Sequence, residues 1–278
     1  MPAEVIRIFS DLHYGDRSSR ITDLAALAPL AEGADRVIIN GDSIDTRAGP
    51  NPAYTAQTRA DLEGFFRQWG PPVTFLSGNH DPDFTPLHYL DLAEGRIFIT
   101  HGDILYPDIV PWGRDAPVVR ERMAAAWRSS PVPWGTASLA ERFAVQRVVA
   151  RSIPQRHQSE PNRWRHLRRL ATDMMWPPWR IASIMAAWLA FPHLAERFMT
   201  TYRPGARFML AGHTHAPGIW RRPEGRIVIN TGSLCRPFGA LAVDFKAQTL
   251  EIRPIEQKGA EFRLGGVVAG LHLAPANR

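Results

Sequence analysis

Short runs of β-branched and aromatic apolar residues recur in the first hundred residues and again after residue 200. Five of these runs each end in a loop that carries Asp, Asn or His, often beside a glycine. The five runs are residues 5–10, 37–40, 73–77, 97–100 and 208–211. Between them, residues 21–31 and 56–69 place apolar side chains at helical spacing, with Thr22 as a possible N-cap of the first. Strands that alternate with helices predict a largely parallel or mixed sheet with helices on its faces.

Residues 107–200 interrupt this alternation. Helical patterns run over residues 117–127, 139–151, 163–175 and 181–199, with proline-rich joins and no convincing strand pattern. We therefore predict a helical insertion, or cap, between the fourth and fifth of the strands that end in polar loops. The core would then consist of residues 1–106 and 201–278.

Strand patterns return after residue 200. Residues 227–230 form an apolar run before the turn signal Thr231-Gly232-Ser233. Residues 240–245 and 249–252 predict a hairpin, whereas the chain from residue 259 onward is glycine-rich and weakly patterned.

The positive charge of the chain lies in the cap. The 278 residues carry a net charge of +6, whereas residues 107–200 alone carry +7, from 14 arginines and 7 acidic residues, and hold seven of the nine tryptophans. Arginine suits phosphate oxygens, and Trp and Met suit an apolar or membrane-interfacial group. We therefore expect substrate contacts from Arg165, Arg168 and Arg169. The alternative is that the tryptophans form the core of the cap and that arginine is simply frequent, at 31 Arg to 2 Lys.

The single cysteine, Cys235, excludes an intramolecular disulfide and suits a reducing compartment. Without a histidine beside it in the sequence, it is interpreted as a structural thiol. No signal-peptide pattern is visible, and the most apolar stretch, residues 181–191, is shorter than the roughly 20 residues that span a bilayer. These features predict a cytoplasmic protein.

The candidate metal-binding and catalytic residues lie in the polar loops at the strand ends. Each motif alone is weak, since Asp-x-His is common by chance and Gly-Asp is typical of turns. Five such loops in order are best explained as one metal site, because ligands bind outside the carboxyl ends of strands in open α/β sheets. The motifs are Asp11-Leu12-His13, Gly41-Asp42, Gly78-Asn79-His80-Asp81, His101-Gly102-Asp103 and Gly212-His213-Thr214-His215.

With these motifs, residues 1–106 and 201–254 resemble the calcineurin-like metallophosphoesterases. The resemblance implies an α/β fold of four layers, in which a two-sheet β sandwich is flanked by helices and holds a dinuclear metal centre. It also implies the ligands, with Asp42 bridging two divalent ions. One ion would be held by Asp11, His13 and His215, and the other by Asn79, His101 and His213.

Imidazole and carboxylate ligands suit Mn²⁺, which we favour, and also Fe and Zn²⁺. Two such ions about 3.5–4 Å apart hold the attacking and leaving oxygens of an in-line displacement, and they acidify a bound water so that a hydroxide nucleophile forms near neutral pH.

His80 is the member of the set that is not assigned to a metal. The resemblance implies that His80 contacts the phosphoryl oxygen or protonates the leaving group. Asp81 could fix the orientation and tautomer of the His80 ring, so both are expected to be catalytic. The alternative for Asp81 is a turn or helix N-cap. Asp45 and Asp103 are polar loop residues near the site.

The order of the motifs and the place of the insertion are also similar to those of the bacterial UDP-2,3-diacylglucosamine pyrophosphatases, which are peripheral membrane enzymes with a basic, apolar lid. This resemblance implies hydrolysis of a phosphodiester or pyrophosphate bond in a lipid-linked nucleotide, with the cap at the inner face of the membrane. The chain departs from that family at His80, where an arginine is usual, and its insertion is longer and richer in Trp.

Three other functions stay open. A basic surface with aromatic side chains also suits a nucleotide or nucleic-acid phosphodiesterase. A phosphoprotein phosphatase shares the core, although the large apolar insertion fits it less well. A non-catalytic scaffold of the same fold is the third, and the complete ligand set argues against it. No obligate protein partner is evident.

Overall fold

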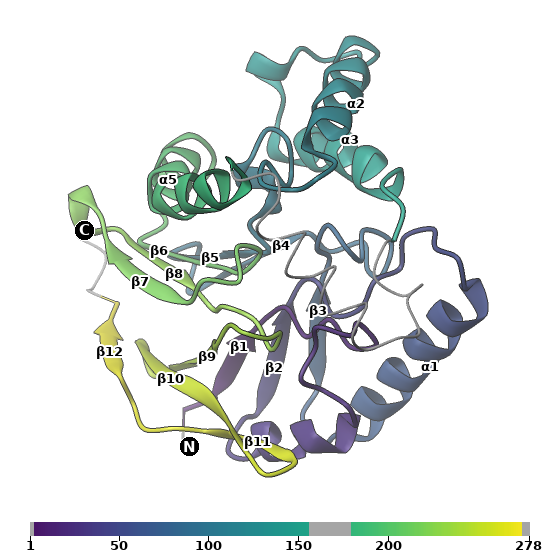
Figure 1. The fold of residues 1–278 in the computed structure, drawn as a ribbon. Coiled ribbons are helices and arrows are strands. Elements are labelled where there is room, and N and C mark those ends of the chain that lie inside the picture. The colour runs from purple at the N-terminus through teal and green to yellow at the C-terminus, as the bar shows by residue number, and fades with distance from the viewer. Residues whose placement is uncertain (1–2, 156–178, 274–278) are drawn as a thin grey trace.

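The computed structural model describes residues 3–155 and 179–273, and the twelve strands of this part of the chain form two sheets that pack face to face (Figure 1). The larger sheet has seven strands in the order β11-β10-β9-β1-β2-β3, with β12 also paired to β10. Its strands are β1 (Ile6–Phe9), β2 (Arg36–Asn40), β3 (Val73–Leu76), β9 (Ala240–Lys246), β10 (Thr249–Lys258), β11 (Glu261–Leu264) and β12 (Ala269–His272). β1, β2 and β3 are parallel, and the remaining pairs are antiparallel.

The smaller sheet has five strands in the order β4-β5-β6-β8-β7. They are β4 (Tyr89–Leu92), β5 (Ile97–Thr100), β6 (Phe208–Ala211), β7 (Gly218–Arg221) and β8 (Ile227–Asn230). The central strands β5, β6 and β8 are parallel, so their carboxyl ends lie at the same edge of the sheet. The outer strands β4 and β7 are antiparallel to their neighbours.

The alternation of side chains explains why the central strands are apolar throughout. Successive residues of a strand point to opposite faces of the sheet. In β6, Phe208 and Leu210 fill the core between the two sheets, whereas Met209 and Ala211 belong to the core on the outer face. Both faces of these strands are buried, which favours continuous apolar runs over a polar alternation.

Helices cover the two outer faces. The 3-10 helix η1 (Leu24–Ala31) and α1 (Pro52–Gln68) contribute to the core outside the larger sheet. On the outer face of the smaller sheet lies α5 (Trp179–Tyr202), which buries Phe191 and Phe198 there (Figure 1). These four layers confirm the predicted two-sheet sandwich flanked by helices.

The remaining helices pack mainly on each other. α2 (Ala116–Arg128) and α3 (Leu139–Arg151) share a small apolar cluster, and α3 also reaches the core of the smaller sheet through Phe143. Both helices agree with the predicted patterns, and the predicted helix 163–175 lies outside the described residues. The division of the chain into core and cap stays a prediction, and α5, which was assigned to the cap, packs on the smaller sheet.

Several local predictions were wrong. The N-cap of η1 is Asp23 rather than Thr22, because the Asp23 side chain accepts a hydrogen bond from the Ala25 N–H. Four strands had no predicted counterpart, namely β4, β7, β11 and β12. β12 shows why, since the pairing of this strand with β10 buries only Leu271 of its four residues.

A buried ion pair joins distant parts of the chain in the larger sheet. Arg7 of β1 lies opposite Asp244 of β9 in the strand register. Its Nε and Nη2 donate to the two Asp244 oxygens at 2.7 and 2.9 Å, and its Nη1 donates to the carbonyl oxygens of Leu30 and Glu32 at 2.7 and 2.8 Å. One guanidinium therefore ties β1 to β9 and to the end of η1.

We expect Arg7→Met to lower the free energy of unfolding by about 3–5 kcal/mol, because it leaves the buried Asp244 carboxylate unpaired. Urea unfolding followed by circular dichroism would measure the loss. The matched control is Arg263→Met, which removes an exposed pair with Glu261 and should leave the free energy of unfolding nearly unchanged. An equal effect of the two substitutions would contradict a structural role for the buried pair.

Candidate metal centre

The five polar loops that follow β1, β2, β3, β5 and β6 meet at one place between the two sheets. Backbone hydrogen bonds join the loops directly. The Asp11 and His13 N–H groups donate to the carbonyl oxygens of Gly41 and Asp42 at 3.1 and 2.9 Å, and the Gly212 N–H donates to His101 at 2.8 Å. Loops that are far apart in the sequence are thus held in one rigid cluster.

Three of the predicted ligands form a first group. The Nε2 atoms of His13 and His215 are 3.1 Å apart. Oδ1 of Asp11 lies 3.7 Å from Nε2 of His13 and 3.3 Å from Nε2 of His215. The structure therefore brings together the three side chains that were predicted to hold one ion.

A second group adjoins the first through Asp42. The potential ligand atoms of Asp42, His101 and His213 lie within 4.8 Å of one another, and so do those of His13, Asp42 and His80. Oδ2 of Asp42 is 3.2 Å from Nε2 of His101 and 3.7 Å from Nε2 of His13. Asp42 thus lies between the two groups, where a bridging carboxylate has to be.

Hydrogen bonds prepare the imidazoles for a cation. Nδ1 of His101 is 3.1 Å from the Asn40 carbonyl oxygen, and Nε2 of His213 is 2.8 Å from that of Ile109. A ring nitrogen that faces a carbonyl oxygen carries the proton, which leaves the lone pair of the other nitrogen for a metal. In both histidines this fixes the tautomer that a ligand needs.

Two buried atoms of the predicted ligands, Oδ1 of Asn79 and Nε2 of His101, make no hydrogen bond of good geometry, although Nε2 of His101 lies 3.2 Å from Oδ2 of Asp42. A buried polar atom without a partner is costly, and such atoms are rare in native proteins. A divalent cation would satisfy both, and the donor set of carboxylate, amide oxygen and imidazole suits Mn²⁺, Fe and Zn²⁺.

The backbone of the site is strained. Five of the seven predicted ligands have a left-handed conformation, which non-glycine residues adopt uncommonly. They are Asp11 (φ 55°), His13 (46°), Asp42 (51°), His213 (69°) and His215 (58°). Such strain persists only where the surroundings enforce it, and it clusters at functional sites. All five strained residues belong to the converging groups described above.

Glycines let the loops approach one another. A Cβ atom on Gly41 would lie 2.5 Å from Nδ1 of His101, and one on Gly212 would overlap the Asp11 carboxylate and the Ser10 hydroxyl. Any side chain at either position would therefore displace a predicted ligand, which explains the glycines within these motifs.

Burial has the largest effect on pKa values in the site, and neighbouring charges oppose it. Burial alone would raise the pKa of Asp42, but His101 and His80 outweigh it and hold that pKa well below its usual value. Burial alone would lower the pKa of His101, but Asp42 and Asp11 raise it to about 10. Burial and His101 lower the pKa of His213 to about 4. Without metal, His101 therefore holds a proton against Asp42.

We expect the affinity for Mn²⁺ to fall as the pH is lowered from 8 to 6, by roughly tenfold per pH unit for each proton displaced. The reason is that the raised pKa of His101 keeps its ring protonated across this range, so the metal has to displace that proton. Isothermal titration calorimetry in buffers of different ionisation enthalpy would measure both affinity and proton release. His272→Ala, an exposed position on β12, serves as the control and should bind normally. An affinity independent of pH would contradict this assignment.

His80 is held by two charged neighbours. Its Nδ1 lies 2.7 Å from Nη2 of Arg47 and 3.1 Å from Oδ2 of Asp45, and Arg47 also donates to both Asp45 oxygens at 2.9 and 2.6 Å. Burial and Arg47 lower the pKa of His80. The lowered pKa favours the neutral ring near pH 7. Nδ1 can accept from Arg47 or donate to Asp45, and the closer contact with Arg47 favours the tautomer that carries its proton on Nε2.

Asp81 does not orient His80 as predicted, because its carboxylate holds the backbone of other loops. It accepts hydrogen bonds from the N–H groups of Ser43 at 2.7 Å, Asp42 at 3.1 Å and Gly78 at 2.5 Å. Burial and the charge of Asp42 raise its pKa to about 6. The carboxylate that contacts the His80 ring is Asp45, and Asp81 instead fixes the loops after β2 and β3.

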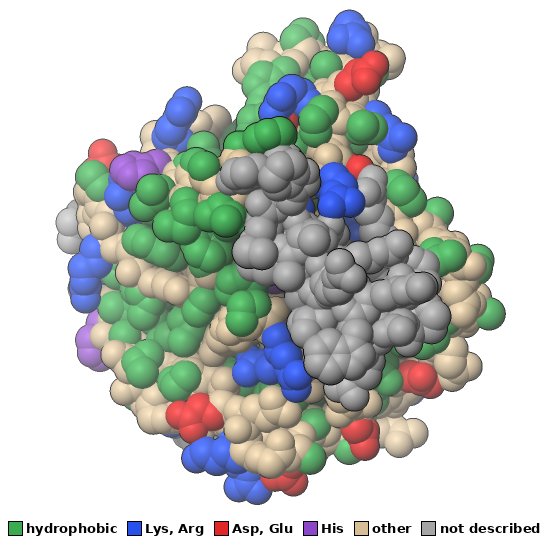
Figure 2. Space-filling model, viewed as in Figure 1, with side chains coloured by type: hydrophobic (Ala, Val, Ile, Leu, Met, Phe, Trp, Pro, Cys, Tyr) green, Lys and Arg blue, Asp and Glu red, His purple; other side chains and the backbone are tan. Residues whose placement is uncertain are grey.

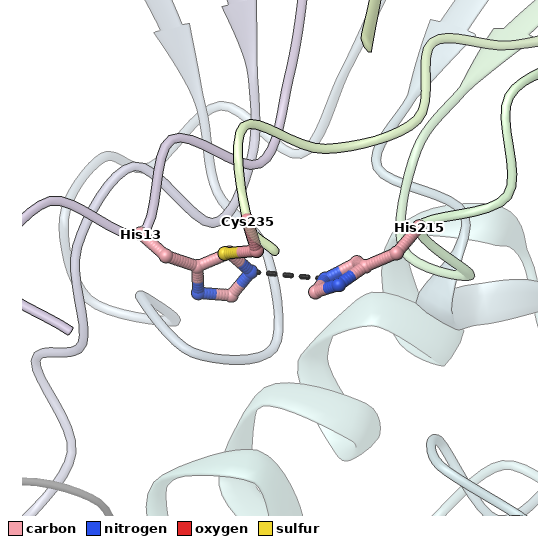
Figure 3. Close-up of side chains that lie close together, drawn as sticks. All are labelled: His13, His215 and Cys235. Atoms are coloured by element: carbon pink, nitrogen blue, oxygen red, sulfur yellow. Dashed lines mark hydrogen bonds between the residues drawn. The ribbon is translucent and has the colours of Figure 1, made fainter. Parts of the chain in front are cut away.

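Besides Arg47, two further residues at the site were not predicted to take part. Arg147 of α3 is buried, donates to the carbonyl oxygens of Gly78 and, at 3.2 Å, Ser77, and lies 3.5 Å from Oδ2 of Asp103. Cys235 lies beside His13 and His215, and the potential ligand atoms of the three are within 4.8 Å of one another (Figure 3). No sequence signal marks these contacts, because the partners are distant along the chain.

The three cap arginines predicted to bind substrate, Arg165, Arg168 and Arg169, lie outside the described residues. Their role stays a prediction. Within the part of the chain that the structure describes, no helix combines the length and apolarity needed to cross a bilayer.

Comparisons with known proteins identify the family of the chain. The model of the calcineurin-like phosphoesterase family matches residues 5–217. The chain belongs to this family, which confirms the resemblance seen in its motifs, and it is a phosphoester hydrolase. The scaffold alternative is thereby set aside.

Two relatives from Stenotrophomonas maltophilia are called UDP-2,3-diacylglucosamine hydrolase. The protein of strain K279a is 28% identical over 227 residues, which are 76% of this chain and 82% of the relative. The protein of strain R551-3 is 28% identical over 265 residues, which are 87% and 96%.

Solved structures with a similar fold include Vps29 of Chaetomium thermophilum, with a TM-score of 0.48, 12% identity and 99% of both chains covered. A dimetal phosphatase from Danio rerio has a TM-score of 0.46 and 12% identity, with 91% of this chain and 96% of that chain covered.

Proposed function

We propose that this hydrolase cleaves a phosphodiester or pyrophosphate bond in a lipid-linked nucleotide of the UDP-2,3-diacylglucosamine kind, with two divalent ions, Mn²⁺ first among them. The names of the two relatives support this substrate class. The observation that carries the proposal is an exposed apolar stripe on α5, the helix whose Trp188 is hydrogen-bonded to the loop of His213 and His215.

The stripe consists of Ile181, Met185 and Leu189, which are 50, 47 and 71% exposed. A spacing of four residues places them on the same face of the helix. Trp179, at the start of α5, is 70% exposed. Figure 2 shows hydrophobic side chains gathered on the face over α5. Contiguous exposed apolar surface of this kind is typical of a binding site.

Trp188 connects the stripe to the metal ligands. Its Nε1 donates to the Thr214 carbonyl oxygen at 3.0 Å, between the two histidines of the motif. The rings of Trp188 and Phe238 are 6.0 Å apart, and those of Phe238 and His215 are 5.8 Å apart. Acyl chains lying along α5 would therefore leave the phosphate group beside the metal ligands.

We assign the residues of the site separate roles in hydrolysis. Asp11, His13 and His215 would hold one ion and Asn79, His101 and His213 the other, with Asp42 between the ions. When bound, the two ions supply a polarised phosphoryl oxygen and an activated water molecule. The neutral His80 ring, with Arg47 at its Nδ1, would donate from Nε2 to a phosphoryl oxygen.

The first experiment is Mn²⁺-dependent hydrolysis of bis-(p-nitrophenyl) phosphate and p-nitrophenyl phosphate by chelated and reloaded protein, with detergent-dispersed UDP-2,3-diacylglucosamine as competitor. We expect cleavage of the diester, suppression by the lipid, and no activity in Asp42→Ala. Diester cleavage indifferent to the lipid would instead favour a nucleotide phosphodiesterase.

A matched pair of substitutions tests the role of the stripe in the same assay. Leu189→Ser should raise the inhibitory concentration of the lipid about tenfold, because a buried leucine side chain contributes about 1.5–3 kcal/mol. Val148→Ser, on the exposed face of α3, should leave it unchanged. Equal effects of both substitutions would show that the lipid does not bind along α5.

We expect His80→Ala to lower kcat about 10²-fold, the usual effect of losing one donor to a developing oxyanion. Because a neutral ring stabilises the phosphoryl oxygen, the loss should be similar for aryl esters with good and poor leaving groups. A loss that grows with the pKa of the leaving group would show that His80 protonates the leaving group instead. Rates for a series of substituted aryl diesters would distinguish these roles.

A further inference from the structure

We infer that Cys235 supplies a sulfur ligand to the ion held by Asp11, His13 and His215, and that this sulfur favours thiophilic ions such as Zn²⁺ over Mn²⁺ at that position. The inference rests on the proposed metal centre and concerns a residue that lies outside its predicted ligand set. It also revises the interpretation of Cys235 as a purely structural thiol.

The geometry brings three donor atoms together. Sγ of Cys235 and one ring nitrogen each of His13 and His215 lie within 4.8 Å of one another, and the two Nε2 atoms are 3.1 Å apart. Figure 3 shows the three side chains converging from separate loops. Bonds of about 2.1 Å to nitrogen and 2.3 Å to sulfur place neighbouring donor atoms of a zinc ion roughly 3–4 Å apart. The donor atoms of the cluster lie within 4.8 Å of one another, so small side-chain shifts would bring Sγ to bonding distance from an ion held by the two histidines.

The turn that carries Cys235 is fastened to the loop of Asp11. The Leu234 N–H donates to the Asp11 carbonyl oxygen at 3.1 Å, and the Cys235 N–H donates to Oγ of Ser233 at 3.0 Å. The Ser18 hydroxyl donates to Sγ at 3.3 Å. Backbone and side-chain contacts therefore hold the buried sulfur in place beside His13, as partners of metal ligands usually do.

The chemistry of sulfur gives the site its preference. Thiolate is a soft ligand that favours Zn²⁺, whereas oxygen ligands suit Mn²⁺. On coordination the S–H bond breaks, the sulfur binds the ion as thiolate and one proton passes to solvent. This adds one negative charge to the pocket that already holds Asp11 and Asp42, which strengthens binding of a divalent ion.

Cobalt substitution tests the inference directly, because the chain has a single cysteine. Metal-free protein is titrated with Co²⁺ and followed by absorption spectroscopy. We expect visible d–d bands as the ion binds, together with a sulfur-to-cobalt charge-transfer band in the near ultraviolet. Cys235→Ser should keep the d–d bands and lose the charge-transfer band.

Competition between metals gives a second measurement. Wild-type protein and Cys235→Ser are equilibrated with equal Zn²⁺ and Mn²⁺, and the bound metals are determined by mass spectrometry. The ratio of zinc to manganese should fall on the order of tenfold in the variant, the scale typical of losing even an outer partner of a metal ligand.

The possible failures are distinguishable. Bound Co²⁺ without a charge-transfer band, or an unchanged metal ratio in Cys235→Ser, would overturn the role of the cysteine and leave the metal centre standing. Absence of any Co²⁺ binding to folded wild-type protein would overturn the centre itself.

Discussion

Two buried carboxylates, Asp11 and Asp42, set the main constraint on this structure, since a buried charge is costly unless it is paired. Both are shielded from solvent and are surrounded by the imidazoles of His13, His101 and His215. Placing these groups together requires left-handed turns and glycines where the loops approach. The strain at the site is therefore a consequence of concentrating charge where the two sheets meet.

The same arrangement connects the sandwich to the substrate surface. The smaller sheet is apolar on both faces, so its outer face needs a helix, and α5 provides the cover with Phe191 and Phe198. A neighbouring side of α5 is left apolar and exposed, which the fold alone does not require. Trp188 lies between these two sides and is hydrogen-bonded to the loop of His213 and His215. α5 thus contributes side chains to the core, supports the loop of His213 and His215, and carries the exposed apolar stripe.

The convergence of the ligand side chains could be predicted because each ligand motif follows an apolar strand, and parallel strands end at a common edge. The pattern itself predicted only a parallel or mixed sheet covered by helices, and the two-sheet sandwich followed from the resemblance of the motifs to a known family. The contacts of residues outside the five motifs could not be predicted. Arg147 meets a loop 69 residues earlier, and Cys235 meets His13 from more than 200 residues away. Asp81 was predicted to orient His80 because the two residues are adjacent in the sequence. In the folded chain the carboxylate of Asp45 contacts the His80 ring instead. Strands such as β12 could not be predicted because they bury too few side chains to produce an alternating apolar pattern in the sequence.

The ligand loops span the chain from Asp11 to His215 and leave from strands of both sheets. A molecule that has formed only one sheet, or has lost the pairing of β5 with β6, cannot assemble the full ligand set. Bound metal per molecule is therefore a count of completely folded chains. In a purified preparation it reports conformational homogeneity directly, with no need for a substrate.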